Sequence, residues 1–221
     1  MSHAAEHGDR PAHLHAHFFT SKQQADSAKL GMWLFLAQEI LFFSGLFMAY
    51  IAFRYLYPET YLAAHEHLSW KLGGLNTIFL ITSSLTMALA VRGAQTSNSK
   101  FCSWMLVITI LFACGFMVVK FFEYKAKISH GMLPGQYYTA HLHGYNIPGN
   151  PGTFFAIYFT MTGTHGLHVL VGIGVLIWIL VGSIQGKYSA EYYSPVENVG
   201  LYWHLVDLIW IFLFPLLYLV K

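Results

Sequence analysis

Ionisable side chains inside long apolar stretches are the residues of this sequence that could do chemistry. Glu39 lies in the run WLFLAQEILFF. His165 and His168 are three residues apart in another apolar stretch. His204 and Asp207 repeat that spacing in the last one. Because such groups are unstable in lipid unless they are paired, each of them is expected to have a partner or a function.

Glu39 has two interpretations that the sequence leaves open. A buried carboxyl can exchange protons, or it can hold a lipid or a partner protein. It can also be a neutral side chain that joins two helices through a hydrogen bond. Glu39 lies about 15 Å into its predicted helix at 1.5 Å per residue, and Asp207 is expected at a similar depth. A polar cluster across the first, fourth and fifth apolar segments is therefore geometrically possible.

The histidines could bind haem or a metal, or they could make hydrogen bonds between helices. A spacing of three residues places His165 and His168 on one face of a helix. Two stacked haems would need histidines about 13–14 residues apart on one helix, so the spacing excludes that arrangement. A single haem between His168 and His204 remains compatible with the spacing. For His165 and His168 we favour structural histidines held by hydrogen bonds. For His204 and Asp207 we favour a contact that holds helices together rather than a proton relay.

The first 28 residues hold five histidines, among them the alternating run His13, His15 and His17. Histidine titrates near neutral pH, so this run could collect protons at a membrane surface or bind a metal. A mobile His-rich tail is the simpler interpretation, and the one that we favour.

The composition restricts the class of protein. Of 221 residues, 56% are hydrophobic and 10% are charged, whereas a soluble domain usually has about a quarter charged residues. This excludes a disordered chain and a nucleic-acid binder built on basic patches. The formal net charge of +2 implies no strongly charged partner, and two cysteines exclude a disulfide scaffold or a thiolate metal cluster.

Five apolar segments are each long enough to cross a bilayer, which takes roughly 20 residues of helix. They cover about 29–55, 72–91, 101–124, 153–184 and 199–220. No alternating pattern typical of a β-barrel is found. The sequence therefore predicts an all-α, polytopic membrane helix bundle with five transmembrane helices in one domain, residues 29–221, after a His-rich tail at 1–28.

Charges near the ends of these segments add little. Lysines and arginines divide six against six between the two sides, so the positive-inside rule does not decide the orientation. Lys120 is expected to snorkel toward the membrane surface and to form an ion pair with Glu123 that has no catalytic role. The polar connection at 125–152 is long enough to have a local role.

Motifs of several enzyme classes are absent from the sequence. There is no phosphate-binding glycine loop, no nucleophile elbow and no HExxH motif. From the residues alone, the chain is a membrane bundle with one buried acid and a few paired histidines, and is expected to be a subunit of a larger assembly.

Five segments of the sequence resemble one family. MTGTHGLHVLVG at 161–172 and YWHLVDLIWIFLFP at 202–215 are similar to the last two helix signatures of subunit III of haem-copper terminal oxidases. LNTIFLITSS at 75–84 and WLFLAQEILFF at 33–43 resemble two further segments of that family, and FEYKAKISHG at 122–131 does so more loosely. The resemblance covers about 190 residues and is closest to the five-helix form of bacterial members.

This resemblance implies a protein without catalytic residues, cofactor or metal of its own. In the family, haems and copper belong to partner subunits, and subunit III docks directly on subunit I, in a complex with subunit II and small subunits. It holds structural phospholipids in a cleft, expected here between the first two helices and the other three. It also supports proton uptake and turnover stability of subunit I. The family fold further implies a cytoplasmic N-terminus and a multi-pass location in the bacterial inner (plasma) membrane.

The resemblance also assigns residues. Glu39 falls at the buried, carbodiimide-reactive glutamate of the family. The other polar residues at signature positions have no established catalytic role; they are His165, His168, Glu197, His204 and Asp207.

Three functional hypotheses follow. The first is a non-redox subunit III of a proton-pumping oxygen reductase, the cytochrome c oxidase of aerobic respiratory electron transport, and so a non-catalytic subunit of an enzyme complex. The second is an accessory subunit of a quinol oxidase or a nitric oxide reductase, because the signatures do not distinguish cytochrome c from quinol as the electron donor. The third is a small haem-b membrane cytochrome that uses His168 and His204.

Overall fold

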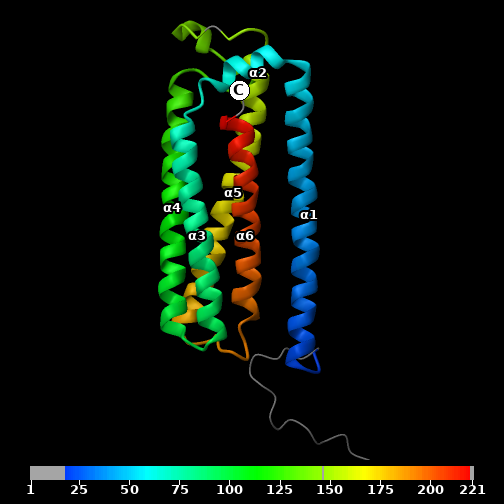
Figure 1. Cartoon of the computed structure of the whole chain (residues 1–221), viewed down its shortest axis with the longest axis vertical. Helices are drawn as coiled ribbons and strands as arrows, with labels where there is room; N and C mark the ends of the chain where they lie inside the picture. The colour runs from blue at the N-terminus through cyan, green and yellow to red at the C-terminus, as the bar shows by residue number, and fades with distance from the viewer. Residues whose placement is uncertain (1–17, 146, 220–221) are drawn as a thin grey trace, which may run out of the picture.

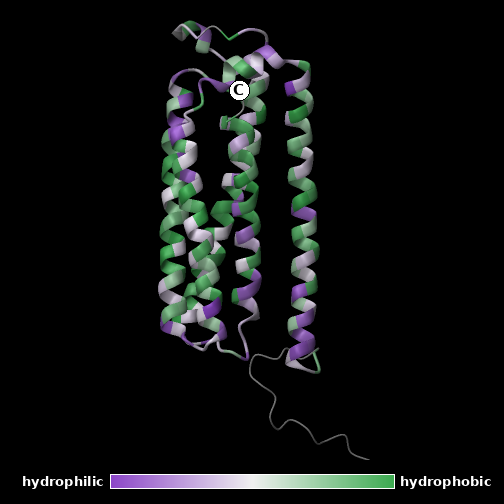
Figure 2. Cartoon of the chain, in the orientation of Figure 1, coloured by the Kyte–Doolittle hydropathy of each residue, from purple (hydrophilic) through white to green (hydrophobic). Residues whose placement is uncertain are grey.

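The computed structural model describes residues 18–145 and 147–219, and its long helices stand side by side (Figure 1). They are α1 (Ser21–Leu56), α3 (Trp70–Gln95), α4 (Ser99–Ser129), α5 (Pro151–Ile184) and α6 (Ser194–Phe214). Each of these five helices is long and apolar enough to cross a membrane. Figure 2 shows hydrophobic residues along the middle of the helices and hydrophilic ones concentrated toward their ends. The predicted all-α, five-helix membrane bundle is confirmed.

The helices extend beyond the apolar stretches that predicted them. α1 begins at Ser21, because the Thr20 hydroxyl oxygen accepts a hydrogen bond from the Gln23 amide at 3.1 Å. The last eight residues of the expected tail, 21–28, are therefore helical. In the same way, the Asn98 side chain caps the start of α4 by accepting from the Phe101 amide at 3.1 Å.

α3, α4, α5 and α6 form a four-helix bundle. α3 and α4 make a tight hairpin, and a Cβ atom added at Gly93 would lie only 2.9 Å from the backbone nitrogen of Cys102. Further along the hairpin, the hydroxyls of Thr86 and Thr109 are 2.8 Å apart. Small residues and hydroxyls thus bring the backbones together, as expected where lipid gives helices no hydrophobic reason to associate.

Two indole groups fasten α6 to α3. The Trp203 Nε1 donates to the Ser83 hydroxyl, and the Trp210 Nε1 donates to the Thr77 hydroxyl, both at 3.1 Å. After Phe214, α6 continues as one π-helical segment, η3 (Pro215–Leu219). Proline has no amide hydrogen, and such wide turns are found where the regular hydrogen-bond ladder is interrupted.

α1 stands apart from this bundle. It packs on α6 and α5, and of its 36 residues only Leu36, Glu39, Phe43 and Tyr50 are buried. Figure 1 shows the same separation. The expected division into two helices against three is therefore wrong: α1 alone lies on one side, and α3 belongs with α4–α6. Hydropathy identifies spans, but it carries no information about which spans are neighbours.

A short helix and the long connection cover the end of the bundle that lies opposite the start of α1 (Figure 1). The helix is α2 (Pro58–His65), and the connection contains the 3-10 turns η1 (Gly135–Tyr137) and η2 (Ala140–His143). The Thr60 hydroxyl donates to the Pro148 carbonyl at 2.8 Å, and the His67 and Tyr145 rings meet edge to face at 5.1 Å. The connection at 125–152 was expected to have a local role. In the structure it covers one end of the bundle together with α2.

Candidate functional site

A carboxyl–imidazole pair joins α1 to α5 in the middle of the membrane-spanning region. The Glu39 Oε2 lies 2.9 Å from the His168 Nε2. The other ring nitrogen, Nδ1, lies 2.8 Å from the Thr164 carbonyl oxygen, and the Tyr202 hydroxyl of α6 donates to the His168 carbonyl at 2.9 Å. Glu39 of the first apolar segment therefore meets a histidine of the fourth. The fifth segment contributes only the Tyr202 hydroxyl, and neither His204 nor Asp207 joins this contact.

These contacts determine how many protons the pair carries. A carbonyl oxygen can only accept, so the His168 Nδ1 carries a hydrogen. The contact between Nε2 and Glu39 then needs one further proton, either on the carboxyl or on the imidazole. The carboxyl and the imidazole consequently share a single proton across this contact.

The pair faces an apolar groove of about 450 Å³ between α1, α5 and α6. The side chains of His168 and Glu39 are 19% and 12% exposed, so both can be reached from it. The rest of the lining is almost entirely hydrocarbon: Met32, Phe35, Leu167, Val171, Val175 and Val199. An elongated apolar molecule would fit this surface.

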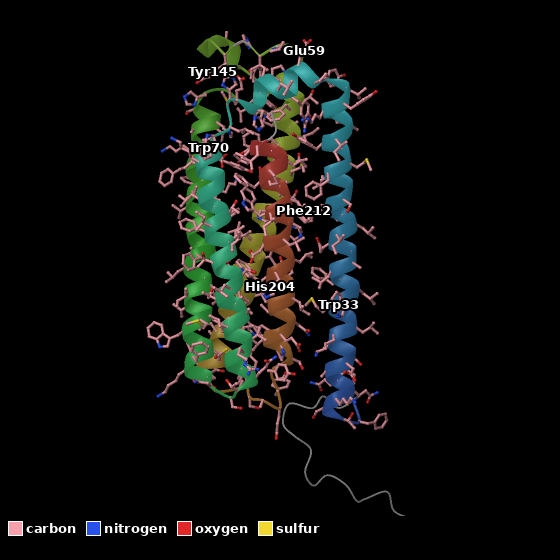
Figure 3. All side chains as sticks on the ribbon, in the orientation of Figure 1. Trp33, Glu59, Trp70, Tyr145, His204 and Phe212 are labelled. Atoms are coloured by element: carbon pink, nitrogen blue, oxygen red, sulfur yellow. The ribbon has the colours of Figure 1, made fainter. Side chains whose placement is uncertain are left out.

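A second apolar groove, of about 340 Å³, lies further along α1 and is walled by α6. Phe43 and Phe47 line it from α1, and Leu208 and Phe212 line it from α6. Figure 3 labels Phe212 on this helix. Both grooves exist because α1 touches the bundle along a narrow line rather than a broad face.

His165 and His168 share a helix but not a site. His165 is fully buried inside the bundle, with its ring 5.5 Å from Phe116 and 5.2 Å from Trp210. Neither of its ring nitrogens has a hydrogen-bond partner among the described residues. The two rings therefore point to different neighbours, His168 to α1 and His165 into the four-helix interior.

His204 and Asp207 do not form the expected pair. The His204 Nδ1 lies 2.7 Å from the Ser84 hydroxyl of α3, and Figure 3 labels His204 on α6. Asp207 is 2% exposed, and within the described residues neither of its carboxylate oxygens has a hydrogen-bond partner. His204 does hold two helices together, as expected, but its partner is a serine.

His168 and His204, the ligands of the haem hypothesis, contact different helices. Both ring nitrogens of His168 are engaged, with Thr164 and Glu39, while His204 bonds to α3. Across residues 18–145 and 147–219, no three His, Cys, Asp or Glu side chains come together in a way that could hold a metal ion. His13, His15 and His17 lie outside the described residues.

Glu197 makes an ion pair near the starts of α1 and α6. Its Oε2 lies 3.0 Å from the Lys29 Nζ, and both side chains are partly exposed. Exposed pairs of this kind contribute about 0–1 kcal/mol. The signature residue Glu197 therefore helps to fasten α1, which the sequence did not predict.

The predicted ion pair of Lys120 with Glu123 is present, but it lies in a buried charge cluster that sequence reasoning missed. Lys120 does not snorkel: it is 6% exposed, and its Nζ lies 2.9 Å from the Glu123 Oε2 and 2.8 Å from the Tyr218 hydroxyl. The Glu123 Oε1 accepts hydrogen bonds from Tyr158 at 3.0 Å and Tyr218 at 2.6 Å. Lys127 is 5% exposed and places its Nζ 5.0 Å from the Tyr158 ring centre.

A sequence signal for this cluster was present. The three charged residues continue the spacing of three or four residues set by Ala113 and Phe116, so they lie on the stripe of α4 that faces the interior. Closeness to the helix end favours snorkelling, but the position of Lys120 on the interior stripe decides its direction.

Comparison with known proteins identifies one family over almost the whole chain. The family model for cytochrome c oxidase subunit III matches residues 12–221. A cytochrome c oxidase subunit 3 from Synechocystis sp. is 31% identical over 211 residues, covering 95% of this chain and 81% of the relative. A probable quinol oxidase subunit 3 from Staphylococcus haemolyticus is 26% identical over 193 residues, covering 87% and 88%.

A fused relative is also similar. The heme-copper oxidase subunit I+III of Aeropyrum pernix is 30% identical over 208 residues, which cover 88% of this chain. The chain spans 23% of the length of that relative.

Proposed function

This chain belongs to the cytochrome c oxidase subunit III family, and from that membership we propose that it is the non-redox subunit III of a proton-pumping haem-copper oxygen reductase. In this proposal it binds phospholipid and supports proton uptake and turnover stability of subunit I. The haems and copper are carried by partner subunits, and this chain acts on the chemistry through its neighbours.

The observation that carries the proposal is the Glu39–His168 pair at the wall of an apolar groove. The 2.9 Å contact holds one shared proton, and the partial exposure of both side chains lets that proton respond to whatever fills the groove. An acyl chain in the groove would exclude water from the pair and keep the proton in place.

The lipid cleft of the proposal differs from the one expected from the family. Its walls are α1 on one side and α5 with α6 on the other, about 450 Å³ and 340 Å³ in two sections. Apolar lining and an opening toward the membrane support acyl chains as the occupants.

We propose that subunit I is the direct partner, in a complex that also contains subunit II and small subunits. The fused subunit I+III relative supports this, because a single chain keeps its two parts close together. The multi-pass chain would lie in the bacterial inner membrane with its N-terminus in the cytoplasm. There, His13, His15 and His17 would collect protons, and deleting residues 1–18 should then shift the pH dependence of oxygen consumption.

A second candidate is subunit 3 of a quinol oxidase, which the Staphylococcus haemolyticus relative supports. The intact complex should be purified and its oxygen consumption assayed with reduced cytochrome c and with quinol. Activity with cytochrome c alone supports the first candidate, and activity with quinol alone supports the second.

A decisive test of the non-redox role uses the chain by itself and in the complex. Visible spectra of the purified chain should show no stoichiometric haem Soret band, and a band that persists would overturn the proposal. In the complex, loss of the subunit should slow proton uptake and shorten the active lifetime during turnover. A lifetime equal to that of the intact complex would contradict the proposed supporting role.

A further inference from the structure

A groove on the side of the bundle away from α1 is lined by both polar and apolar residues. It lies between α4 and α5, at the end of the bundle where α1 begins, and has a volume of about 300 Å³. Its polar lining is Ser99, Lys100, Ser103 and Ser183, and its apolar lining is Trp104, Val107, Leu180 and Ile184. α1 packs on α5 and α6, so this groove is separate from those that α1 forms.

The order of these residues follows depth in the membrane. Ser99 and Lys100 are the first two residues of α4, and Val107 lies about 12 Å deeper at 1.5 Å per residue. Trp104 lies between them and is 67% exposed, as expected of an aromatic side chain at the membrane interface. Ile184, the last residue of α5, lies at the polar end beside Ser183. The rest of the lining changes from polar at the interface to apolar toward the membrane interior, which is the polarity of a phospholipid.

The polar end offers hydrogen-bond donors and positive charge. Lys100 is exposed and makes no ion pair among the described residues. The Asn98 cap satisfies the Phe101 amide, so the Ser99 and Lys100 amides have no partner within the helix. The first turn of a helix also carries partial positive charge. Together these groups are complementary to a phosphate.

The floor of the groove is fixed by hydroxyl contacts. The Ser103 hydroxyl donates to the Ser99 carbonyl at 2.8 Å and lies 2.9 Å from the Ser183 hydroxyl. Ser183 is 1% exposed, so these contacts join α4 to α5 directly below the polar end. The groove is therefore preformed rather than opened by a ligand.

We propose that this groove binds an anionic phospholipid of the leaflet on the N-terminal side of the membrane. The phosphate lies at Lys100 and the first turn of α4, and one acyl chain lies along Val107 and Leu180 toward the membrane interior. The proposal does not depend on the oxidase role of the chain.

The test uses the intact complex in phosphatidylcholine vesicles that contain a minor fraction of phosphatidylglycerol with a photoreactive acyl chain. After illumination, mass spectrometry should find the lipid on peptides that contain 99–107 and 177–184. Lys100→Gln should lower this labelling about fivefold, because a lysine near an anionic lipid surface contributes about 1 kcal/mol. High salt should weaken labelling of the unchanged protein as well.

Two matched variants complete the test. Lys71→Gln is the control, because Lys71 is an exposed lysine outside the groove. Like Lys100 it has a tryptophan nearby, with its Nζ 5.9 Å from the Trp70 ring. Labelling should be unchanged in this variant. Val107→Trp keeps every charge and fills the apolar end, so labelling should fall. Equal loss in Lys100→Gln and Lys71→Gln would overturn the proposal, as would finding these two peptides cross-linked to another subunit instead of lipid.

Discussion

α1 and the α3–α6 bundle are both apolar helices of one chain, yet they are held in place differently. The bundle has close backbone contacts, such as Gly93 against Cys102, and a buried charge cluster around Glu123. α1 has four buried residues and is fastened by polar contacts at three levels: Lys29 with Glu197, Glu39 with His168, and Tyr50 with the Leu216 carbonyl at 2.7 Å.

The difference reflects the solvent. Lipid is as apolar as leucine, so burying hydrocarbon gives little attraction between helices, and polar contacts contribute on average about 0.6 kcal/mol each. A helix fastened by three such contacts can move without unfolding the rest of the molecule. We therefore expect the bundle to be the stable part and α1 to be the adjustable part that lines the grooves.

The largest effect is expected inside the bundle. Glu123→Leu leaves Lys120 and Lys127 without a carboxylate, and breaking a buried pair in this way destabilises by about 3–5 kcal/mol. Thermal unfolding of the purified complex should shift strongly, whereas Glu59→Leu, at an exposed position on α2, should have little effect. Equal shifts would show that the cluster does not stabilise the bundle.

A smaller effect is expected at the middle contact of α1. Glu39→Leu removes the hydrogen bond to His168 and should loosen α1 by about 1–2 kcal/mol, seen as faster backbone hydrogen exchange in α1 while α3–α6 stay unchanged. If exchange rises equally in both regions, the separation drawn here between α1 and the bundle is wrong.

Glu39→Gln separates attachment from proton exchange. The amide can still donate to the His168 Nε2, so folding and the position of α1 should be retained. Reaction with a hydrophobic carbodiimide should disappear, because the amide offers no carboxyl, and mass spectrometry of the labelled chain measures this. Labelling that persists in the variant would show that another residue carries the reactive carboxyl. Asp207 is the first alternative, because it is also a buried carboxyl.

Tyr50→Phe tests the third contact. It removes only the hydroxyl that donates to the Leu216 carbonyl, which is expected to destabilise the outer half of α1 by about 1 kcal/mol. Hydrogen exchange near Tyr50 should rise and that near Lys29 should not. The exposed Tyr55, changed to Phe, is a matched control.

The smallest effect concerns pH at the α2 end. Burial lowers the pKa of His65 and of His67 from their usual value of 6.5. The unfolded segment therefore takes up protons before the folded one, so stability is fully present above that value and decreases as the pH falls below it. Exchange in 58–68, corrected for its intrinsic pH dependence, should rise at low pH, and less so in His65→Gln. The same pH dependence in this variant would exclude His65 as a cause.

The sequence was sufficient for the helices and partly for the site. Long apolar runs predicted all five spans. The depth of Glu39 suggested Asp207 of the fifth segment as a neighbour, whereas its partner is His168 of the fourth. The partner of His204 was missed because Ser84 is a common residue with no distinctive signal. The Lys120 cluster was missed because hydropathy averages over a helix and does not show which face turns inward. The isolation of α1 depends on packing between distant segments, which local patterns do not encode.

The π-helical segment after Pro215 has a consequence for both regions. It presents the Leu216 carbonyl to Tyr50 on α1, and two residues later it presents the Tyr218 hydroxyl to Lys120 and Glu123. A regular α-helical winding there would rotate both groups away from their present directions. If the Tyr50 end of α1 moves, the displacement passes through these five residues to the hydroxyl that contacts Lys120 and Glu123. The segment therefore couples the position of α1 to the buried charge cluster.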